Sequence, residues 1–366
     1  MNIMLGKHRL AVDRFTEAHW ILEPYADEEF ALWSEIVPRS DTVYILGREI
    51  LSQSFADIFT SDTGDLVFCN LAEGSETIEW QMWKLGVSDL VQRGRLGLMH
   101  GGDALSDLAT VRSDIHFTNI VDFASNQQAH AQASQVRTPD PKPYSFLMLN
   151  GRLRLHRKRL IDLLRSRGLL EQALWTNLQS TVDPPTGSTA YTTEPIRLLP
   201  PQYEIESTTQ PQIDQGWVKP LLFAGLSWGD AVINPRAYID SYFSLVTETV
   251  FNHTCSFLTE KTWKPMIMCH PFVIAANPGF YRDLRRKGFQ TFSHVIDESF
   301  DLIENEQDRA RRIVEIVQDI CYNGASDFLM STREQCEHNY QQLQIYTKQQ
   351  RQQLVIDLEK YLDKRS

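Results

Sequence analysis

The chain has 366 residues, of which 42% are hydrophobic and 23% charged, a composition that predicts a globular protein and excludes a disordered one. Its formal charge of −11 excludes a general nucleic-acid-binding surface, so any anion site must be a local cluster of basic residues. Five scattered cysteines without a CxxC pair predict neither a disulfide framework nor a zinc site and favour the cytoplasm. No apolar run approaches the roughly 18 residues of a membrane span, and the N-terminus lacks the apolar core of a signal peptide.

The first 140 residues are predicted to form a domain in which short strands and helices alternate. Alternation of this kind favours a parallel sheet with helices on both faces. The strands are expected at Thr42–Leu46, Leu66–Cys69, Leu96–Met99 and Phe117–Val121, with helices such as Glu28–Ile36 and Glu76–Leu85 between them. A length of 366 residues suits two domains, each able to bury its own core.

Two predicted loops of this domain contain titratable side chains. Glu73 follows the second strand, and His100-Gly101-Gly102-Asp103 follows the third. Ligands of parallel sheets bind beyond the carboxyl ends of the strands, and glycines let the backbone approach a ligand closely. Glu73, His100 and Asp103 are therefore candidate acid–base residues. The alternative is that the glycines make a turn and Asp103 caps the next helix.

Residues 127–143 are polar and contain three closely spaced prolines, Pro139, Pro141 and Pro143. Because proline does not continue a helix, this segment is predicted to be an interdomain linker. A second domain, residues 141–330, is expected to open with the strand Tyr144–Leu149.

A strongly basic segment follows this strand. Asn150–Arg167 contains seven Lys or Arg residues and a single acidic residue, in an otherwise acidic chain. Arg152 and Arg157 are candidates for binding a diphosphate, because a guanidinium can bind two phosphate oxygens at once. The alternative is a solvated basic face of a helix.

Residues 179–220 are rich in Pro, Thr, Gln and Ser and show no periodicity, which predicts a lid or flap, with disorder as the alternative. The strands Leu221–Ala224 and Tyr242–Val246 are predicted to resume the sheet. The second leads into Thr247-Glu248-Thr249. A carboxylate at a strand end seldom stays unpaired, so Glu248 is expected to hold a ligand hydroxyl, or else to have a buried structural role.

The segment Ser256–Asn277 predicts a loop, a short helix and a buried strand. Thr259 can cap the helix, whose first backbone N–H groups favour an anion, and Lys261 adds a full positive charge at the same place. Glu260 is an acceptor suited to the hydroxyls of a ribose or a sugar. Together, Thr259, Glu260 and Lys261 indicate a site for a sugar nucleotide.

The remaining chain is predicted to be helical. Tyr281–Lys287 predicts a basic helix that ends at Gly288. A later helix is expected to bury the apolar face made by Ala310, Ile313, Val314, Ile316, Val317 and Ile320. Residues 331–366 predict a polar C-terminal helix that packs back across the domains. They sustain no heptad pattern, which disfavours a coiled coil.

Several of these segments resemble the donor-site region of the α1,3-fucosyltransferases. The matching segments are Val246-Thr247-Glu248-Thr249, Phe257-Leu258-Thr259-Glu260-Lys261 and His270-Pro271-Phe272-Val273. In that family an acidic-Asn pair on a strand precedes an aromatic-x-Thr-Glu-Lys loop, whereas here Thr249 replaces the Asn and Phe257 the usual Tyr. A further match runs from Lys142–Phe146 through Asn150 to Arg157. The resemblance is confined to the C-terminal half.

This resemblance implies the GT-B arrangement, in which two Rossmann-like domains face each other across a cleft. It implies an enzyme that transfers a sugar from a nucleoside-diphosphate sugar, with GDP-fucose as the type of donor, to an acceptor hydroxyl with inversion. A base would deprotonate the acceptor while cationic groups stabilise the departing diphosphate. The donor-binding residues would be Asn150, Arg152, Arg157, Glu248, Thr259, Glu260 and Lys261. No Asp-x-Asp motif ends a strand, so neither a metal nor another cofactor is expected. The expected partners are the sugar nucleotide and an acceptor, and nothing indicates an oligomeric state.

Two other hypotheses are compatible with the sequence. One is a sugar-phosphate or nucleotide enzyme of another reaction class, which is disfavoured because the glycine-rich phosphate-binding patterns are missing. The other is a carbohydrate-binding or nucleotide-binding protein of the same fold without catalysis. Binding of nucleoside diphosphates would separate a donor site from a module that binds glycans alone.

Overall fold

The computed structural model describes residues 2–5, 7–12, 42–47, 66–70, 96–101, 110–113, 129–138, 141–181, 192–203, 221–223, 226–228, 233–252 and 258–363. The chain divides into two compact units. The first comprises residues 1–121 and 346–366, and the second comprises residues 122–345. Each contains parallel β-structure, so the predicted α/β class is confirmed. The domain boundaries expected at residues 140 and 330 stay predictions.

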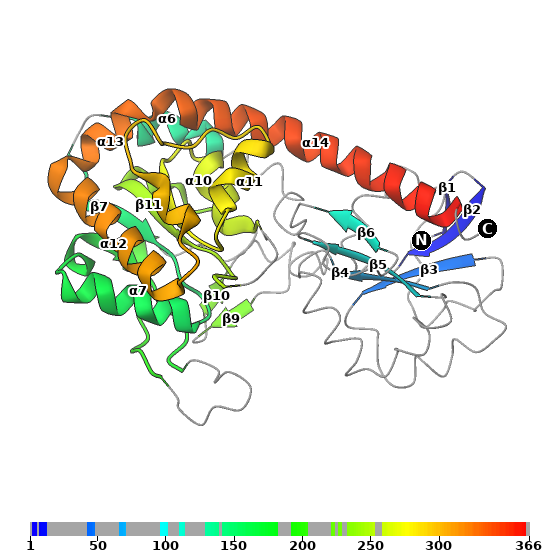
Figure 1. The fold of residues 1–366 in the computed structure, drawn as a ribbon, viewed down its shortest axis with the longest axis horizontal. Coiled ribbons are helices and arrows are strands. Elements are labelled where there is room, and N and C mark those ends of the chain that lie inside the picture. Colours follow the sequence, from blue (N-terminus) through cyan, green and yellow to red (C-terminus); the bar gives the residue numbers. More distant parts are fainter. Residues whose placement is uncertain are drawn as a thin grey trace. The chain divides into compact units, whose positions relative to one another are not determined.

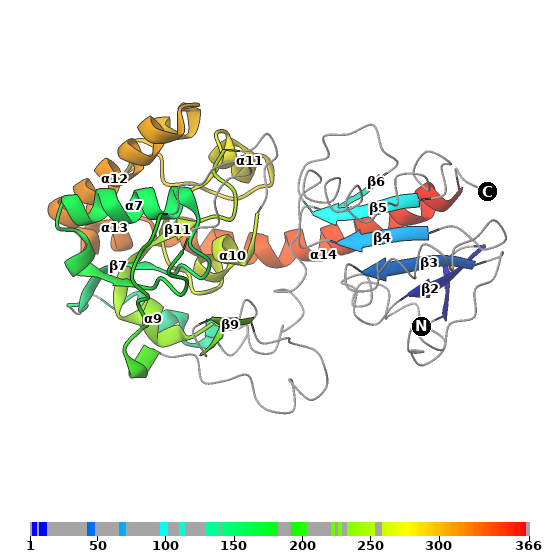
Figure 2. The same ribbon diagram turned by 90° about the horizontal axis from the view of Figure 1, so that it is seen from below.

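Six short strands form the sheet of the first unit, in the order of the sequence (Figure 2). They are β1 (Asn2–Leu5), β2 (His8–Val12), β3 (Thr42–Gly47), β4 (Leu66–Asn70), β5 (Leu96–Gly101) and β6 (Thr110–Ser113). β1 pairs with β2 in antiparallel orientation, and the other neighbours are parallel. Three of these strands, β3, β4 and β5, were predicted. The predicted strand Phe117–Val121 and the predicted helices Glu28–Ile36 and Glu76–Leu85 lie outside the described residues.

The end of β5 corrects one prediction from the sequence. His100 and Gly101 were expected in a loop, but both belong to the strand. His100 pairs with Asn70 of β4 on one side and with Arg112 of β6 on the other. Backbone pairing on both sides explains why the strand continues through a residue followed by two glycines.

Four parallel strands form the sheet of the second unit, in the order β8-β7-β11-β12. They are β7 (Tyr144–Met148), β8 (Ala173–Trp175), β11 (Ser241–Thr247) and β12 (Phe272–Ala275). Every residue of β8 and β12 is buried, as expected for strands with helices on both faces. The predicted strands at Tyr144 and Tyr242 and the apolar strand that ends before Asn277 are confirmed.

Helices cover both faces of this sheet (Figures 1 and 2). Phe243 and Ser244 are neighbours on β11 and point to opposite faces. The Phe243 ring packs on Phe328 of α13 (Ala325–Ser331), whereas Ser244 bonds to His270, whose ring packs on Tyr238 of α9 (Pro235–Ile239). α7 (Leu155–Ser166) and α12 (Glu306–Asn323) lie in contact with each other, and α12 buries the predicted apolar face.

The C-terminal third is helical, as predicted. Besides α12 and α13 it contains α11 (Phe280–Arg286), followed by Gly288 with a positive φ, and the long helix α14 (Arg333–Asp363). Residues 333–345 of α14 belong to the second unit and residues 346–363 to the first. None of the described helices combines the length and the apolar character that a membrane span requires.

Two predictions for the second unit were wrong. The predicted linker, residues 127–143, contains the helix α6 (Ala133–Val136), because Ala129, Ala133 and Val136 are spaced to form a buried apolar face before the prolines begin. The predicted strand at Leu221 does not join the main sheet. It forms β9 (Leu221–Phe223), which among the described strands pairs only with β10 (Leu226–Trp228), in a separate two-stranded antiparallel sheet. Of the predicted flap, residues 179–181 and 192–203 are described, and its role stays a prediction.

The buried His270 predicts a dependence of stability on pH. Its Nε2 donates to the Ser241 carbonyl (2.9 Å) and its Nδ1 accepts from the Ser244 hydroxyl (2.8 Å). Burial lowers the pKa of His270 from 6.5 to about 3. Between pH 6.5 and about pH 3, the imidazole of His270 therefore binds a proton in the unfolded chain but not in the folded chain. The stabilisation is complete above pH 6.5 and is lost as the pH falls towards 3.

We therefore expect the free energy of unfolding of the second unit to fall by about 2 kcal/mol between pH 7.5 and pH 5 on account of this residue. Urea denaturation at the two pH values measures the change. In His270→Gln, the number of protons taken up on unfolding near pH 5 should fall by about one. An unchanged pH dependence of the unfolding free energy in this variant would contradict the assignment.

Candidate functional site

The sheet of the second unit reverses its strand order between β7 and β11. From β7 the chain passes to β8 on one side, and then to β11 and β12 on the other. In open α/β sheets, ligands bind beyond the carboxyl ends of the strands at such a reversal. The described strands of the first unit follow the sequence order and show no such reversal. Residues after Met148 and after Thr247 therefore define the candidate site.

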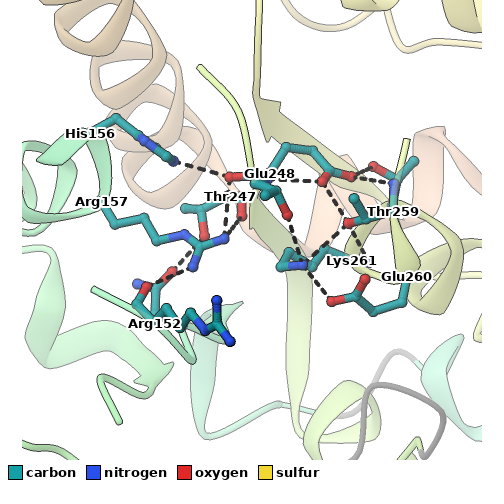
Figure 3. Close-up of polar contacts among 11 residues, drawn as sticks. Arg152, His156, Arg157, Thr247, Glu248, Thr259, Glu260 and Lys261 are labelled. Carbon is teal, nitrogen blue, oxygen red and sulfur yellow. Dashed lines mark hydrogen bonds and ion pairs between the residues drawn. The ribbon is translucent and has the colours of Figure 1, made fainter. Parts of the chain in front are cut away.

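The N-terminus of α10 (Glu260–Ile267) lies at this edge (Figure 3). Thr259 is its N-cap, as predicted, and its hydroxyl accepts from the backbone N–H of Lys261 (3.4 Å). Lys261 Nζ donates to the hydroxyls of Thr249 and Thr259, each at 3.3 Å, and forms an ion pair with Glu260. These contacts hold the ammonium of Lys261 over the segment that leaves β11.

Glu248 is used differently from the prediction. Its carboxylate accepts from the backbone N–H groups of Thr249 (3.1 Å) and Thr259 (3.2 Å). It also accepts from the hydroxyls of Thr259 (2.6 Å) and Thr262 (2.5 Å), and the side chain is completely buried. Glu248 is therefore a structural acceptor that joins the end of β11 to the start of α10, and the expected contact of its carboxylate with a ligand hydroxyl is replaced by these protein donors.

Arg157 of α7 connects the two strand exits. Its Nη1 donates to the carbonyl of Arg152 (2.7 Å), and its Nη2 donates to the carbonyls of Thr247 (3.0 Å) and Glu248 (3.2 Å). The side chain is 2% exposed, and burial lowers its pKa to about 10, so the guanidinium stays protonated at neutral pH. Arg157 and Lys261 thus meet on the same segment, Thr247–Thr249, from two distant parts of the chain (Figure 3).

Arg152 and Asn150 lie on the loop that Arg157 fixes. The Arg152 side chain is exposed, and its guanidinium has no hydrogen-bond or ion-pair partner within the described part of the chain. Asn150 is fully buried; its Oδ1 accepts from the Thr247 hydroxyl (2.5 Å), whereas its Nδ2 has no partner among the described residues. Of the two arginines, Arg152 is therefore the one available to a ligand.

Two residues that sequence reasoning missed support the segment after β11. His156 Nε2 donates to the Glu248 carbonyl (3.0 Å), and burial together with the Arg157 charge lowers the pKa of His156, which keeps it neutral. Arg309 of α12 donates to the Phe251 carbonyl and to the Ala276 carbonyl after β12 (3.2 Å). Its guanidinium lies 4.3 Å from the centre of the Phe251 ring, on which His156 also stacks. No local pattern marks these contacts, because the partners are far apart in sequence.

A small hollow lies between α10, α9 and the ends of β7 and β11. Its volume is about 40 Å³, and its lining includes Tyr238, Thr247, Glu260, Lys261 and Lys264. Arg157 does not line it. The hollow therefore lies on the α10 side of the site. Arg157 reaches the strand exits from α7 and bonds to their backbone carbonyls without lining the hollow.

The predicted residues fall into two groups. All seven predicted donor-binding residues lie around the exits of β7 and β11 or on the adjoining start of α10. Of the predicted acid–base residues, His100 is the next-to-last residue of β5 in the first unit, whereas Glu73 and Asp103 lie outside the described residues. No protein-family model, curated protein or solved structure matches the chain.

Proposed function

We propose that this chain is a glycosyltransferase that moves a sugar from a nucleoside-diphosphate sugar to an acceptor hydroxyl with inversion. One observation carries the proposal: a cationic site, formed by Lys261, Arg152 and the N-terminus of α10, lies at the reversal of strand order in the second unit. Donors at such a place favour an anionic ligand. The motif resemblance to α1,3-fucosyltransferases supports the choice of a GDP-fucose-like donor.

In this mechanism the basic residues stabilise the leaving group. Lys261 and Arg152 would bind the diphosphate as the bond to the sugar breaks, because preorganised charges stabilise negative charge that develops in the transition state. Arg157 would fix the position of the loop that contains Arg152 relative to the end of β11, through its contacts with three backbone carbonyls. Glu260 would accept from a hydroxyl of the ribose or of the sugar.

In this proposal the first unit binds the acceptor. In a GT-B arrangement the two compact units are the two Rossmann-like domains, and the first binds the acceptor. A base deprotonates the acceptor hydroxyl as it attacks the anomeric carbon from the face opposite the diphosphate. His100, Asp103 and Glu73 are the candidates for that base.

The function is tested with a panel of GDP-, UDP- and CMP-linked sugars and mixed glycan acceptors. Release of the free nucleotide together with a glycosylated product is the expected result. Calorimetric titration of GDP and UDP into the same protein separates the alternatives. Tight binding without product would support the non-catalytic binding protein of the same fold, and binding of glycans without any nucleotide would overturn the proposal.

Arg152→Ala is expected to weaken nucleoside diphosphate binding by roughly ten- to a hundredfold, the range for a lost hydrogen bond between charged groups. Stability should not change, because the side chain is exposed. Arg311→Ala, on the exposed surface of α12, is the matched control. Calorimetry and thermal unfolding of both variants measure the two effects, and equal affinity in the two variants would exclude Arg152 from the site.

A further inference from the structure

Side chains from two helices hold the segment that follows β11. Residues 249–252 belong to neither a strand nor a helix, so no regular ladder fixes their positions. His156 of α7 donates to the Glu248 carbonyl just before this segment (3.0 Å), and Figure 3 shows its imidazole pointing at that oxygen. Arg309 of α12 donates to the Phe251 carbonyl near the end of the segment. The path of the chain between these two carbonyls therefore depends on His156 and Arg309.

The ring of Phe251 brings these two side chains together. The His156 imidazole stacks on it, with the ring centres 5.2 Å apart and the planes inclined by 8°, and the Arg309 guanidinium lies 4.3 Å from its centre. All three side chains are buried. Ring stacking and cation–π contacts favour defined geometries, and the latter strengthen where water is excluded. We call His156, Phe251 and Arg309 the clamp.

The ammonium of Lys261 is linked to this segment. Its Nζ has three acceptors within the described part of the chain, and two of them, Thr259 and Glu260, are its near neighbours in sequence. The third is the Thr249 hydroxyl (3.3 Å), which alone of the three comes from the strand side of the site. A lysine has a flexible stem, so its acceptors determine where its charge lies. Thr249 lies between the two carbonyls that the clamp holds.

We infer that the clamp positions the Lys261 ammonium through Thr249, which makes His156, Phe251 and Arg309 positioning residues for the leaving group. The inference rests on the proposed function and deepens it. A charge stabilises the departing diphosphate best when it is already held at the required place before the bond breaks. In this role the clamp acts on the diphosphate through Lys261 and not by contact.

A double-mutant cycle between His156 and Lys261 tests the inference, with inorganic pyrophosphate titrated calorimetrically into the full chain. His156→Leu removes the donor to the Glu248 carbonyl and should weaken pyrophosphate binding about threefold to tenfold, the range for one hydrogen bond. In a chain that carries Lys261→Ala, the same substitution should change the affinity by less than about twofold, because no ammonium remains to be positioned. His156→Gln keeps an N–H donor and should recover most of the affinity.

Phe251→Leu is the second variant, because it removes the ring and keeps an apolar side chain. It should weaken pyrophosphate binding over the same range, and again only while Lys261 is present. Arg309 is less suited to substitution, because it also donates to the carbonyls of Ala276 (3.2 Å) and Glu304 (3.0 Å).

His338→Leu is the matched control. Its Nε2 also donates to a backbone carbonyl, that of Gly288 (2.9 Å), but it lies on α14. Its loss should leave pyrophosphate affinity unchanged.

The outcomes separate the clamp from the donor site. If Lys261→Ala weakens pyrophosphate binding while His156→Leu and Phe251→Leu do not, the clamp is wrong and the donor site stands. Equal losses from His156→Leu with and without Lys261 would also overturn the clamp, because they would show an effect independent of the ammonium. If the unaltered chain binds neither pyrophosphate nor GDP, the proposed function fails and the clamp with it. Should His156→Leu not fold by thermal unfolding, Phe251→Leu decides by the same comparisons.

Discussion

Lys261→Ala is expected to reduce sugar transfer by about 100- to 1,000-fold, the usual cost of removing one preorganised donor from a developing negative charge. The ammonium of Lys261 donates to the hydroxyls of Thr249 and Thr259 at the exit of β11, and Lys261 lines the hollow beside α10. Loss of this charge should also weaken GDP binding in the absence of an acceptor. Initial rates of nucleotide release and calorimetric titration measure both effects.

The control for this variant is Lys348→Ala, which removes an exposed lysine from α14 and should change neither quantity. Urea denaturation must show that Lys261→Ala keeps its fold. We expect that it does, because the capping bond of Thr259 involves the backbone N–H of residue 261 and not its side chain. Near-normal transfer by a folded Lys261→Ala would remove the assignment of this residue to the leaving group.

Glu248→Ala is expected to lower the free energy of unfolding by about 3–5 kcal/mol, the range for removing one partner from a buried charged network. It leaves two backbone N–H groups and two threonine hydroxyls without their acceptor. It also removes the negative charge that raises the pKa of the buried Arg157. Urea denaturation of the full chain at neutral pH measures the loss.

Glu248→Gln separates the charge from the shape of this side chain. Its amide oxygen can still accept two of the four bonds, so it should recover part of the stability. GDP affinity should fall in both variants, because the Thr259 cap and the start of α10 lose their anchor. A loss below about 1 kcal/mol in Glu248→Ala would show that the network contributes no more than an ordinary hydrogen bond.

The elements around the site could be predicted from the sequence because their signals are local. β7, β11 and β12 are short apolar runs bounded by polar residues, and the Thr259 cap followed by Lys261 marks the start of α10. Local signals did not predict that β9 pairs with β10, because the residue pattern of a strand does not show which strand it pairs with. They did not predict α6, because the prediction of a linker relied on the three prolines and not on the helical spacing of the apolar residues before them.

The use of each site residue could not be predicted, because it depends on strand order and on distant partners. Arg157 was expected to bind phosphate, yet its guanidinium holds carbonyls about ninety residues away in sequence. Glu248 was expected to face a ligand, yet four protein donors surround it. The reversal between β7 and β11 brings these segments together, and no residue pattern encodes that order. Lys264 was missed because its spacing from Lys261 indicates only a shared helix face, and the structure is needed to show that both residues line the hollow.

The most direct test of this account is a crystal structure of the chain with bound GDP. The account predicts that the diphosphate lies beyond the carboxyl ends of β7 and β11, with its oxygens within hydrogen-bond distance of Lys261 and Arg152. A nucleotide bound at any other part of the second unit, or at the first unit, would contradict it.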